Sequence, residues 1–207
     1  MVRLAALAAL LVCCFQAVAD PDAATRLGVL LQGMRQIEAD FHQTLVDEHD
    51  EVLQESSGRV VLQHPGRFRW ETRVPFEQLV VSDGTSVWQY DDDLQQVVIR
   101  PLDRRADQVP SLLLSGEIEQ VKRLYEISSR TDDAGAERFE LLPREPGGPF
   151  SSLAIQFRNA VLERLEIADG MGQRTVVSFE AVHSIEKADE SLFVFVTPPG
   201  VDELHDE

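Results

Sequence analysis

The feature that most constrains the fold is a succession of short segments, between residues 37 and 182, in which apolar and polar residues alternate. Alternation with a period of two puts successive side chains on opposite faces of a β-strand. Turn signals separate the segments, and Asp83-Gly84 and Asp169-Gly170 are dipeptides typical of tight hairpins. No regular alternation with helices interrupts the series. The pattern therefore predicts a meandering antiparallel sheet, which at this length usually curls to hide one apolar face.

Helical patterns flank and interrupt these strands. Asp20-Pro21-Asp22 is typical of a helix start, and an apolar stripe at helical spacing follows from Leu27 to Met34. The stretch 107–124 contains a proline, three consecutive leucines and a Ser-Gly break, and is predicted to form two short inserted helices. The predicted strands are 37–42, 58–72, 77–82, 86–90, 95–100, 124–130, 138–143, 152–158, 161–169 and 174–182. We expect a mainly β fold with lid helices over the concave face of a curved sheet.

The N-terminus has the pattern of a secretory signal peptide. Arg3 precedes an apolar run, 4–12, and Ala17-Val18-Ala19 forms an A-x-A cleavage site, so we expect cleavage after Ala19. The run is too short to cross a bilayer of about 30 Å as a helix. Lipid attachment at Cys13 or Cys14 is the alternative, but the A-x-A site lies beyond both cysteines.

Cleavage would leave residues 20–207, which is enough for one domain with a sizeable core. Both cysteines would leave with the signal peptide, so no disulfide is expected. The formal charge of −17 disfavours binding to nucleic acid and to anionic lipid surfaces, because phosphates would be repelled.

Three consecutive aspartates, Asp91, Asp92 and Asp93, raise the possibility of a metal site. They lie between two predicted strands, where aspartate is common because its side chain caps backbone N–H groups. A calcium loop of the D-x-D-x-D-G type requires a glycine at its sixth position and a distal glutamate, but Gln96 and Leu102 occupy those positions. We expect these aspartates to turn the chain.

Motifs for catalysis or cofactor binding are also missing from the sequence. The five histidines form no zinc-binding pattern, and there is no G-x-S-x-G elbow, dinucleotide fingerprint or Walker loop. The charge-rich segments 46–51 and 202–207 are predicted to be solvated. We expect neither an enzyme nor a cofactor-binding protein, although a secreted hydrolase with an unrecognised site stays an alternative.

Large apolar side chains recur on single faces of the predicted strands. Phe68 and Trp70 share one face, Trp88 and Tyr90 share another, and Leu153 to Phe157 repeat the pattern. Such faces form either a filled core or the lining of a cavity under a helical lid. Alternation alone does not separate the two, because both bury the same residues.

Three motifs resemble the family of periplasmic lipoprotein carriers called LolA. They are Phe41-x-Gln43, the block 58–97 with its Pro65-x-x-Phe68-x-Trp70 and Ser82-Asp83-Gly84 elements, and the terminal segment 192–200, "LFVFVTPPG". The resemblance implies an incomplete β-barrel covered by an N-terminal helix and short inserted helices. A related half-barrel module that binds lipid-bearing ligands as a sensor stays an alternative. Such a module would usually carry an additional domain.

The resemblance also implies a route and partners. Carriers of this family take triacylated outer-membrane lipoproteins from the inner-membrane transporter LolCDE and pass them across the periplasm to the outer-membrane receptor LolB. The family pattern implies a monomer without cofactor.

Site residues follow from the same resemblance. Phe68 and Trp70 would line the cavity, and Leu112, Leu113 and Leu114 would face it from the lid. Family members often have an arginine before the proline that here follows His64, where it fastens the lid through hydrogen bonds to carbonyl groups. His64 is therefore a candidate lid lock, and a weaker one, because neutral histidine has one N–H donor where arginine has five.

Overall fold

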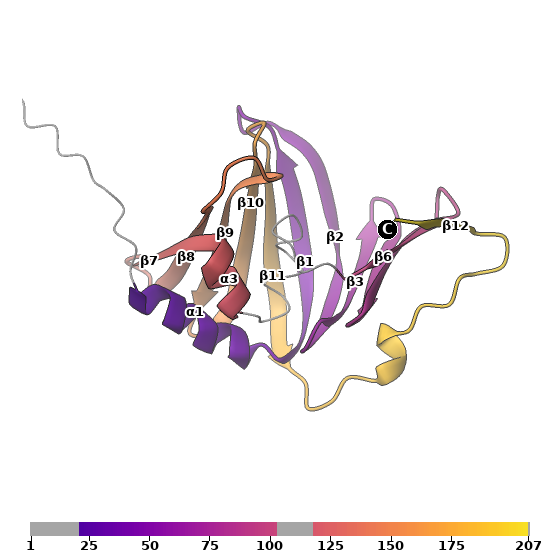
Figure 1. Ribbon diagram of the computed structural model, residues 1–207, viewed down its shortest axis with the longest axis horizontal. Helices are drawn as coiled ribbons and strands as arrows, with labels where there is room; N and C mark the ends of the chain where they lie inside the picture. The colour runs from indigo at the N-terminus through magenta and orange to yellow at the C-terminus, as the bar shows by residue number, and fades with distance from the viewer. Residues whose placement is uncertain (1–20, 103–117, 207) are drawn as a thin grey trace, which may run out of the picture.

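The computed structural model describes residues 21–102 and 118–206, which form one twelve-stranded sheet with two α-helices and a short 3-10 helix (Figure 1). The helices are α1 (Pro21–Gly33), α3 (Ile118–Leu124) and η2 (Glu190–Phe193). The strands are β1 (Gln36–Val46), β2 (Val52–Gln63), β3 (Arg67–Val74), β4 (Gln78–Asp83), β5 (Ser86–Asp91), β6 (Gln96–Pro101), β7 (Tyr125–Thr131), β8 (Ala136–Pro143), β9 (Phe150–Arg158), β10 (Val161–Asp169), β11 (Arg174–Ser184) and β12 (Asp202–His205).

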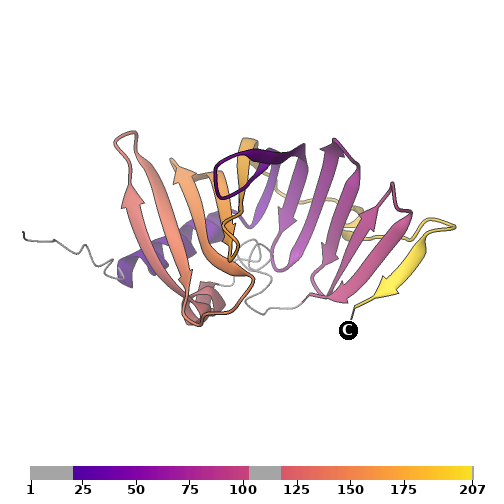
Figure 2. The ribbon, with the colours of Figure 1, turned by 90° about the horizontal axis from the view of Figure 1, so that it is seen from above.

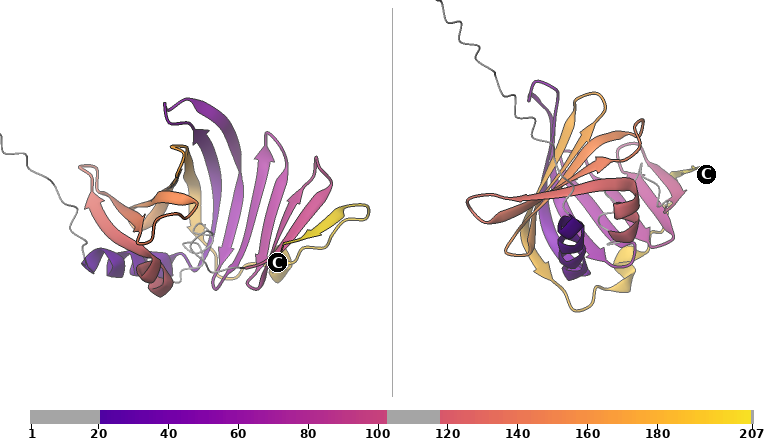
Figure 3. Two further views of the ribbon diagram at one scale, coloured as in Figure 1. Left: turned by 45° about the horizontal axis from the view of Figure 1, so that its top comes forward. Right: turned by 60° about the vertical axis from the view of Figure 1, so that its left-hand side comes forward.

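The sheet consists of two antiparallel meanders that join where β1 pairs with β11. The strand order is β12-β6-β5-β4-β3-β2-β1-β11-β10-β9-β8-β7, and only the β12–β6 pair is parallel. Among the described strands no ladder joins β7 to β12, so the sheet curves strongly but stays open (Figures 2 and 3). The prediction of a curved antiparallel sheet forming an incomplete barrel is confirmed.

Helix α1 lies against the concave face on the β7 side of the sheet (Figure 3, right). Ala23, Leu27 and Leu31 are fully buried, so the predicted apolar stripe does pack against the sheet. Of the two helices predicted within 107–124, α3 is the second, and the first lies outside the described residues. In this half of the molecule the concave side is a filled core, where Phe139 and Phe157 meet edge to face at 6.1 Å.

The convex face is also partly buried, because the chain after β11 crosses it. Val61 forms a second apolar cluster with Ala188 and Phe193, and the Tyr90 and Phe195 rings lie 5.7 Å apart. The strand register puts Trp88 opposite Val81, so Trp88 and Tyr90 share the convex face and not the concave one. Alternation correctly predicts a shared face here, but not which face.

Two predicted segments differ from the structure. Residues 58–72 contain two strands instead of one run, because Pro65 has no N–H to donate and Gly66 takes a φ of 70° in the turn. The tail 202–207 differs in containing β12, although residues 202–206 are exposed, as predicted for a solvated segment. Its main chain pairs with the edge strand β6, which does not require apolar side chains.

Close packing of strands requires a glycine at position 58. In the β2–β3 ladder the register shifts between Ser57 and Gly58. A Cβ atom at Gly58 would overlap the carbonyl oxygen of Glu71 and lie 2.9 Å from Cα of Thr72. The two backbones therefore approach closely only because this residue has no side chain.

An ion-pair network crosses the three strands β8, β9 and β10. Glu166 accepts hydrogen bonds from Arg138 Nη2 and from Arg164 Nε, both at 2.7 Å. The side chains of Arg138 and Glu166 are only 21% and 18% exposed. The hydrogen bond from Arg138 holds the pKa of Glu166 below its usual range.

We expect Glu166→Gln to lower the free energy of unfolding at pH 7 by about 1–2 kcal/mol, because a charge-assisted hydrogen bond is lost. A carboxylate whose pKa is depressed in the folded state stabilises the fold above its unfolded pKa of about 4.3, and this contribution fades as pH falls through the folded value. The difference between wild type and variant should therefore shrink below pH 4 in urea titrations. Glu145→Gln, at an exposed loop position, is the control. A difference that stays constant from pH 7 to pH 3 would contradict this account.

Candidate functional site

An apolar cavity of about 240 Å³ opens on the concave face, between the two halves of the sheet. Seven strands separated in the sequence contribute to it, which only the curvature of the sheet makes possible. Its lining residues are Gln43, Phe68, Trp70, Val80, Val87, Arg100, Leu165, Ile167, Thr175 and Val177.

Trp70, which lines this cavity, packs against two further aromatic rings. Trp70 lies 4.2 Å from the Phe41 ring, tilted by 35°, and meets the Phe179 ring edge to face at 6.2 Å. Such contacts add about 0.5–1.5 kcal/mol each beyond the area that they bury. The three rings link β3, β1 and β11, so Trp70 is held in place by side chains from two other strands.

The structure places the residues that sequence analysis singled out as follows. Phe68 and Trp70 come together in the cavity lining. His64 directly follows β2, and its main-chain N–H donates to the carbonyl of Arg35 at 2.7 Å, in the connection between α1 and β1. Leu112, Leu113 and Leu114 lie outside the described residues.

Alternation left open whether these apolar faces form a filled core or line a cavity. The answer differs between the two halves of the sheet. Leu153, Ile155 and Phe157 belong to a filled core beneath α1 and α3. Phe68 belongs to the same core, Trp70 packs against it, and both also border the cavity.

Sequence reasoning missed the polar members of the lining, Gln43, Thr175 and Arg100. Gln43 was noted only as part of a motif. Arg100 could have been found, since it follows the apolar residues of its strand at a spacing that puts it on the face of Val98. The identity of that face depends on long-range pairing, however.

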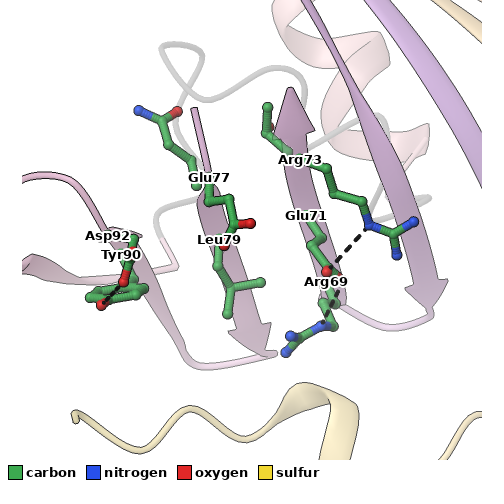
Figure 4. Close-up of a pocket in the computed structure, with 9 residues that line it drawn as sticks. Arg69, Glu71, Arg73, Glu77, Leu79, Tyr90 and Asp92 are labelled. Carbon is green, nitrogen blue, oxygen red and sulfur yellow. Dashed lines mark hydrogen bonds and ion pairs between the residues drawn. The ribbon is translucent and has the colours of Figure 1, made fainter. Parts of the chain in front are cut away.

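A second and larger pocket, of about 380 Å³, lies at β3, β4 and β5 and is lined mainly by charged and polar side chains (Figure 4). Glu71 forms ion pairs with Arg73 at 3.4 Å and with Arg69 at 3.8 Å. Tyr90 donates a hydrogen bond to Asp92, and this bond raises the pKa of Tyr90. Because charged and polar side chains line most of it, this pocket does not suit an apolar ligand.

The aspartates beside this pocket turn the chain, as predicted. Asp91 Oδ1 accepts the N–H of Leu94 at 3.1 Å, and the carbonyl of Asp92 accepts the N–H of Gln95 at 3.2 Å. These bonds close the hairpin between β5 and β6.

Within residues 21–102 and 118–206, no helix has the length and apolarity that crossing a membrane requires.

Comparison of the sequence with known proteins finds one family and several similar relatives. Residues 32–196 match the family "Outer membrane lipoprotein carrier protein LolA". An outer-membrane lipoprotein carrier protein of Chromohalobacter salexigens is 40% identical over 92% of this chain and 90% of its own length. One of Pseudomonas fluorescens is 38% identical over 100% of this chain and 99% of its own length.

A solved structure shares the fold. An uncharacterized conserved protein from Thermus thermophilus superposes with a TM-score of 0.54 at 14% identity, over 88% of this chain and 99% of that one. At this identity the similarity concerns the fold alone. The family match and the relatives show that this chain belongs to the LolA family of outer-membrane lipoprotein carrier proteins.

Proposed function

We propose that this protein binds the acyl chains of outer-membrane lipoproteins and carries them through the periplasm. The observation that carries the proposal is the apolar cavity on the concave face, in a chain of the LolA family. Phe68 and Trp70 would contact the acyl chains directly. The protein would act by binding and release, as a chaperone and not as an enzyme.

The physical need for such a carrier is large. Burying one CH₂ group contributes about 0.8 kcal/mol, so one sixteen-carbon chain contributes roughly 13 kcal/mol against water. A lipoprotein with three such chains would not leave a membrane for water unaided. The apolar side chains of the cavity replace the membrane as the environment of these chains.

Loading requires the cavity to widen. Pockets for drug-sized ligands have volumes of about 300–1,000 Å³, and the present volume is about 240 Å³. We infer that α1 shifts away from the sheet as acyl chains enter. Helix α1 contacts the sheet mainly through apolar side chains such as Leu27 and Leu31, and a shift would also break the hydrogen bond from Arg26 to Glu137 of β8.

The proposed route begins with export, by cleavage after Ala19, of a single carrier domain comprising residues 20–207. The protein would then act as a monomer that receives triacylated lipoproteins from LolCDE and delivers them to LolB. Leu112, Leu113 and Leu114 would complete the apolar surface from the lid.

Purification from native periplasm tests the proposal. Mass spectrometry of the purified protein should detect a triacylated lipoprotein bound in an about equimolar complex. The same preparation of Phe68→Glu should lack it. A wild-type protein that never carries an acylated ligand would contradict the carrier function.

His64→Arg tests the candidate lid lock. Arginine supplies five donors in a fixed fork, so the variant should hold the lid more firmly and slow the entry of an apolar fluorescent dye several-fold. Stopped-flow fluorescence measures the rate. His49→Arg, in the β1–β2 turn, adds the same group away from the connection between α1 and β1 and is the control. Equal rates in all three proteins would show that position 64 does not hold the lid.

A further inference from the structure

Arg100 is the one cationic side chain among the described residues that line the apolar cavity. It lies on β6 opposite Val87 of β5, and both side chains border the cavity. Its Nε atom is buried and has no hydrogen-bond partner in the described part of the chain. Arg100 therefore places a charged group at an apolar surface, and its Nε–H donor has no acceptor in the described part of the chain.

This arrangement is unusual in a chain with so many carboxylates. The sequence has 36 acidic and 19 basic residues, and several other half-buried arginines are paired with carboxylates. Arg138 donates to Glu166 and Arg26 donates to Glu137, each at 2.7 Å. A buried donor without a partner costs about 1–3 kcal/mol, and more when the group is charged. A ligand that supplies an acceptor oxygen would remove that cost.

If Arg100 only extended from the cavity rim into water, the burial of its Nε atom would not be explained. A long arginine at a rim can bury its methylene groups and keep its charged end in water. In that arrangement the donors would be solvated, whereas Nε of Arg100 is shielded from solvent.

The acyl ligand carries acceptors at the required place. Each acyl chain of a triacylated lipoprotein ends in an ester or amide carbonyl, at the junction with the polar part of the molecule. These oxygens lose water when the chains enter an apolar cavity, and a guanidinium with several donors can replace that water. Gln43 and Thr175, which also line the cavity, offer neutral polar groups nearby.

We propose that Arg100 binds the ester carbonyl oxygens at the junction between acyl chains and glycerol, and so sets how deeply the chains enter. This inference rests on the proposed carrier function and specifies a recognition element within it. Arg100 would then select acylated ligands over hydrocarbon of the same length.

Two synthetic ligands separate carbonyl recognition from hydrocarbon burial. One is a triacylated lipopeptide, and the other is its analogue in which both glyceryl esters are replaced by ethers. Titration of the purified protein, followed by tryptophan fluorescence, gives a Kd for each. We expect the wild type to bind the ester form at least about tenfold more tightly than the ether form, because hydrogen bonds to charged groups are strong.

Arg100→Met removes the donors but keeps an unbranched apolar stem, so the variant should bind both ligands with the weaker affinity of the ether form. Arg100→Lys, a second variant that keeps the charge with fewer donors, should show an intermediate preference. Arg69 lies outside this cavity, in the charged pocket. Arg69→Met is therefore the matched control and should keep the full preference for the ester ligand.

Specific outcomes would overturn the inference. Equal binding of ester and ether ligands by the wild type would exclude carbonyl recognition. A retained ester preference in Arg100→Met would assign the recognition to another residue. Binding of neither ligand by the wild type would instead refute the carrier function itself, and the inference with it.

Discussion

Phe68→Glu is expected to remain soluble and folded but to lose the binding of acylated ligands. The Phe68 side chain is 8% exposed and borders the cavity, so a glutamate there would face the acyl chains. Removing a carboxylate from water costs several kcal/mol even after relaxation, and each 1.4 kcal/mol is a factor of ten in affinity. Affinity for a triacylated lipopeptide should therefore fall by about a hundredfold or more.

The fold should survive because the cavity gives the glutamate a path toward solvent. Phe76→Glu is the matched control, since Phe76 is 61% exposed in the turn between β3 and β4. It should bind lipopeptide as the wild type does. Circular dichroism and lipopeptide titration check both variants. A Phe68→Glu protein that is unfolded at room temperature would indicate a solid core at this position and count against the cavity as the binding site.

Gly58→Ala should have the largest effect on stability. The added methyl group would overlap the main chain of Glu71, and a backbone cannot move aside as the end of a flexible side chain can. Residues of β2 and β3 near the register shift would have to separate, which breaks ladder hydrogen bonds beside the cavity wall. We expect a loss of about 4 kcal/mol or more, a large part of the stability of a typical domain.

Gly33→Ala is the control for this prediction. Gly33 ends α1, and a Cβ atom there would meet nothing within 4 Å. Alanine also reduces the conformational freedom of the unfolded chain, so the variant should be neutral or slightly more stable. Urea denaturation of both variants measures the difference. Similar midpoints for Gly58→Ala and wild type would show that the two strands can separate locally at little cost.

The sequence determined most of the strands, several turns and the N-terminal helix, because these depend on local patterns. Alternation marked β4, β5 and β6, and aspartates predicted the β5–β6 turn that their hydrogen bonds close. The aromatic pair Phe68 and Trp70 was also recognisable, since residues two apart in a strand share a face.

Tertiary structure decided which face each pair occupies. Trp88 and Tyr90 follow the same alternation as Phe68 and Trp70, yet they lie on the convex side, near the segment after β11. No local signal predicts that crossing, because Val61 and Phe193 are more than a hundred residues apart in sequence. The sequence did not predict β12 for a related reason. Main-chain pairing with β6 stabilises this strand, although the segment is acidic and has a low strand propensity.

The cavity itself is a property of the assembled sheet. Its walls come from strands as distant as β1, β6 and β11, and curvature brings them together. The sequence determined that apolar residues line strand faces and that an arginine follows Ile99. Only the pairing of β6 with β5 placed Arg100 at the cavity, because strand register fixes a side chain's face and long-range contacts fix the register.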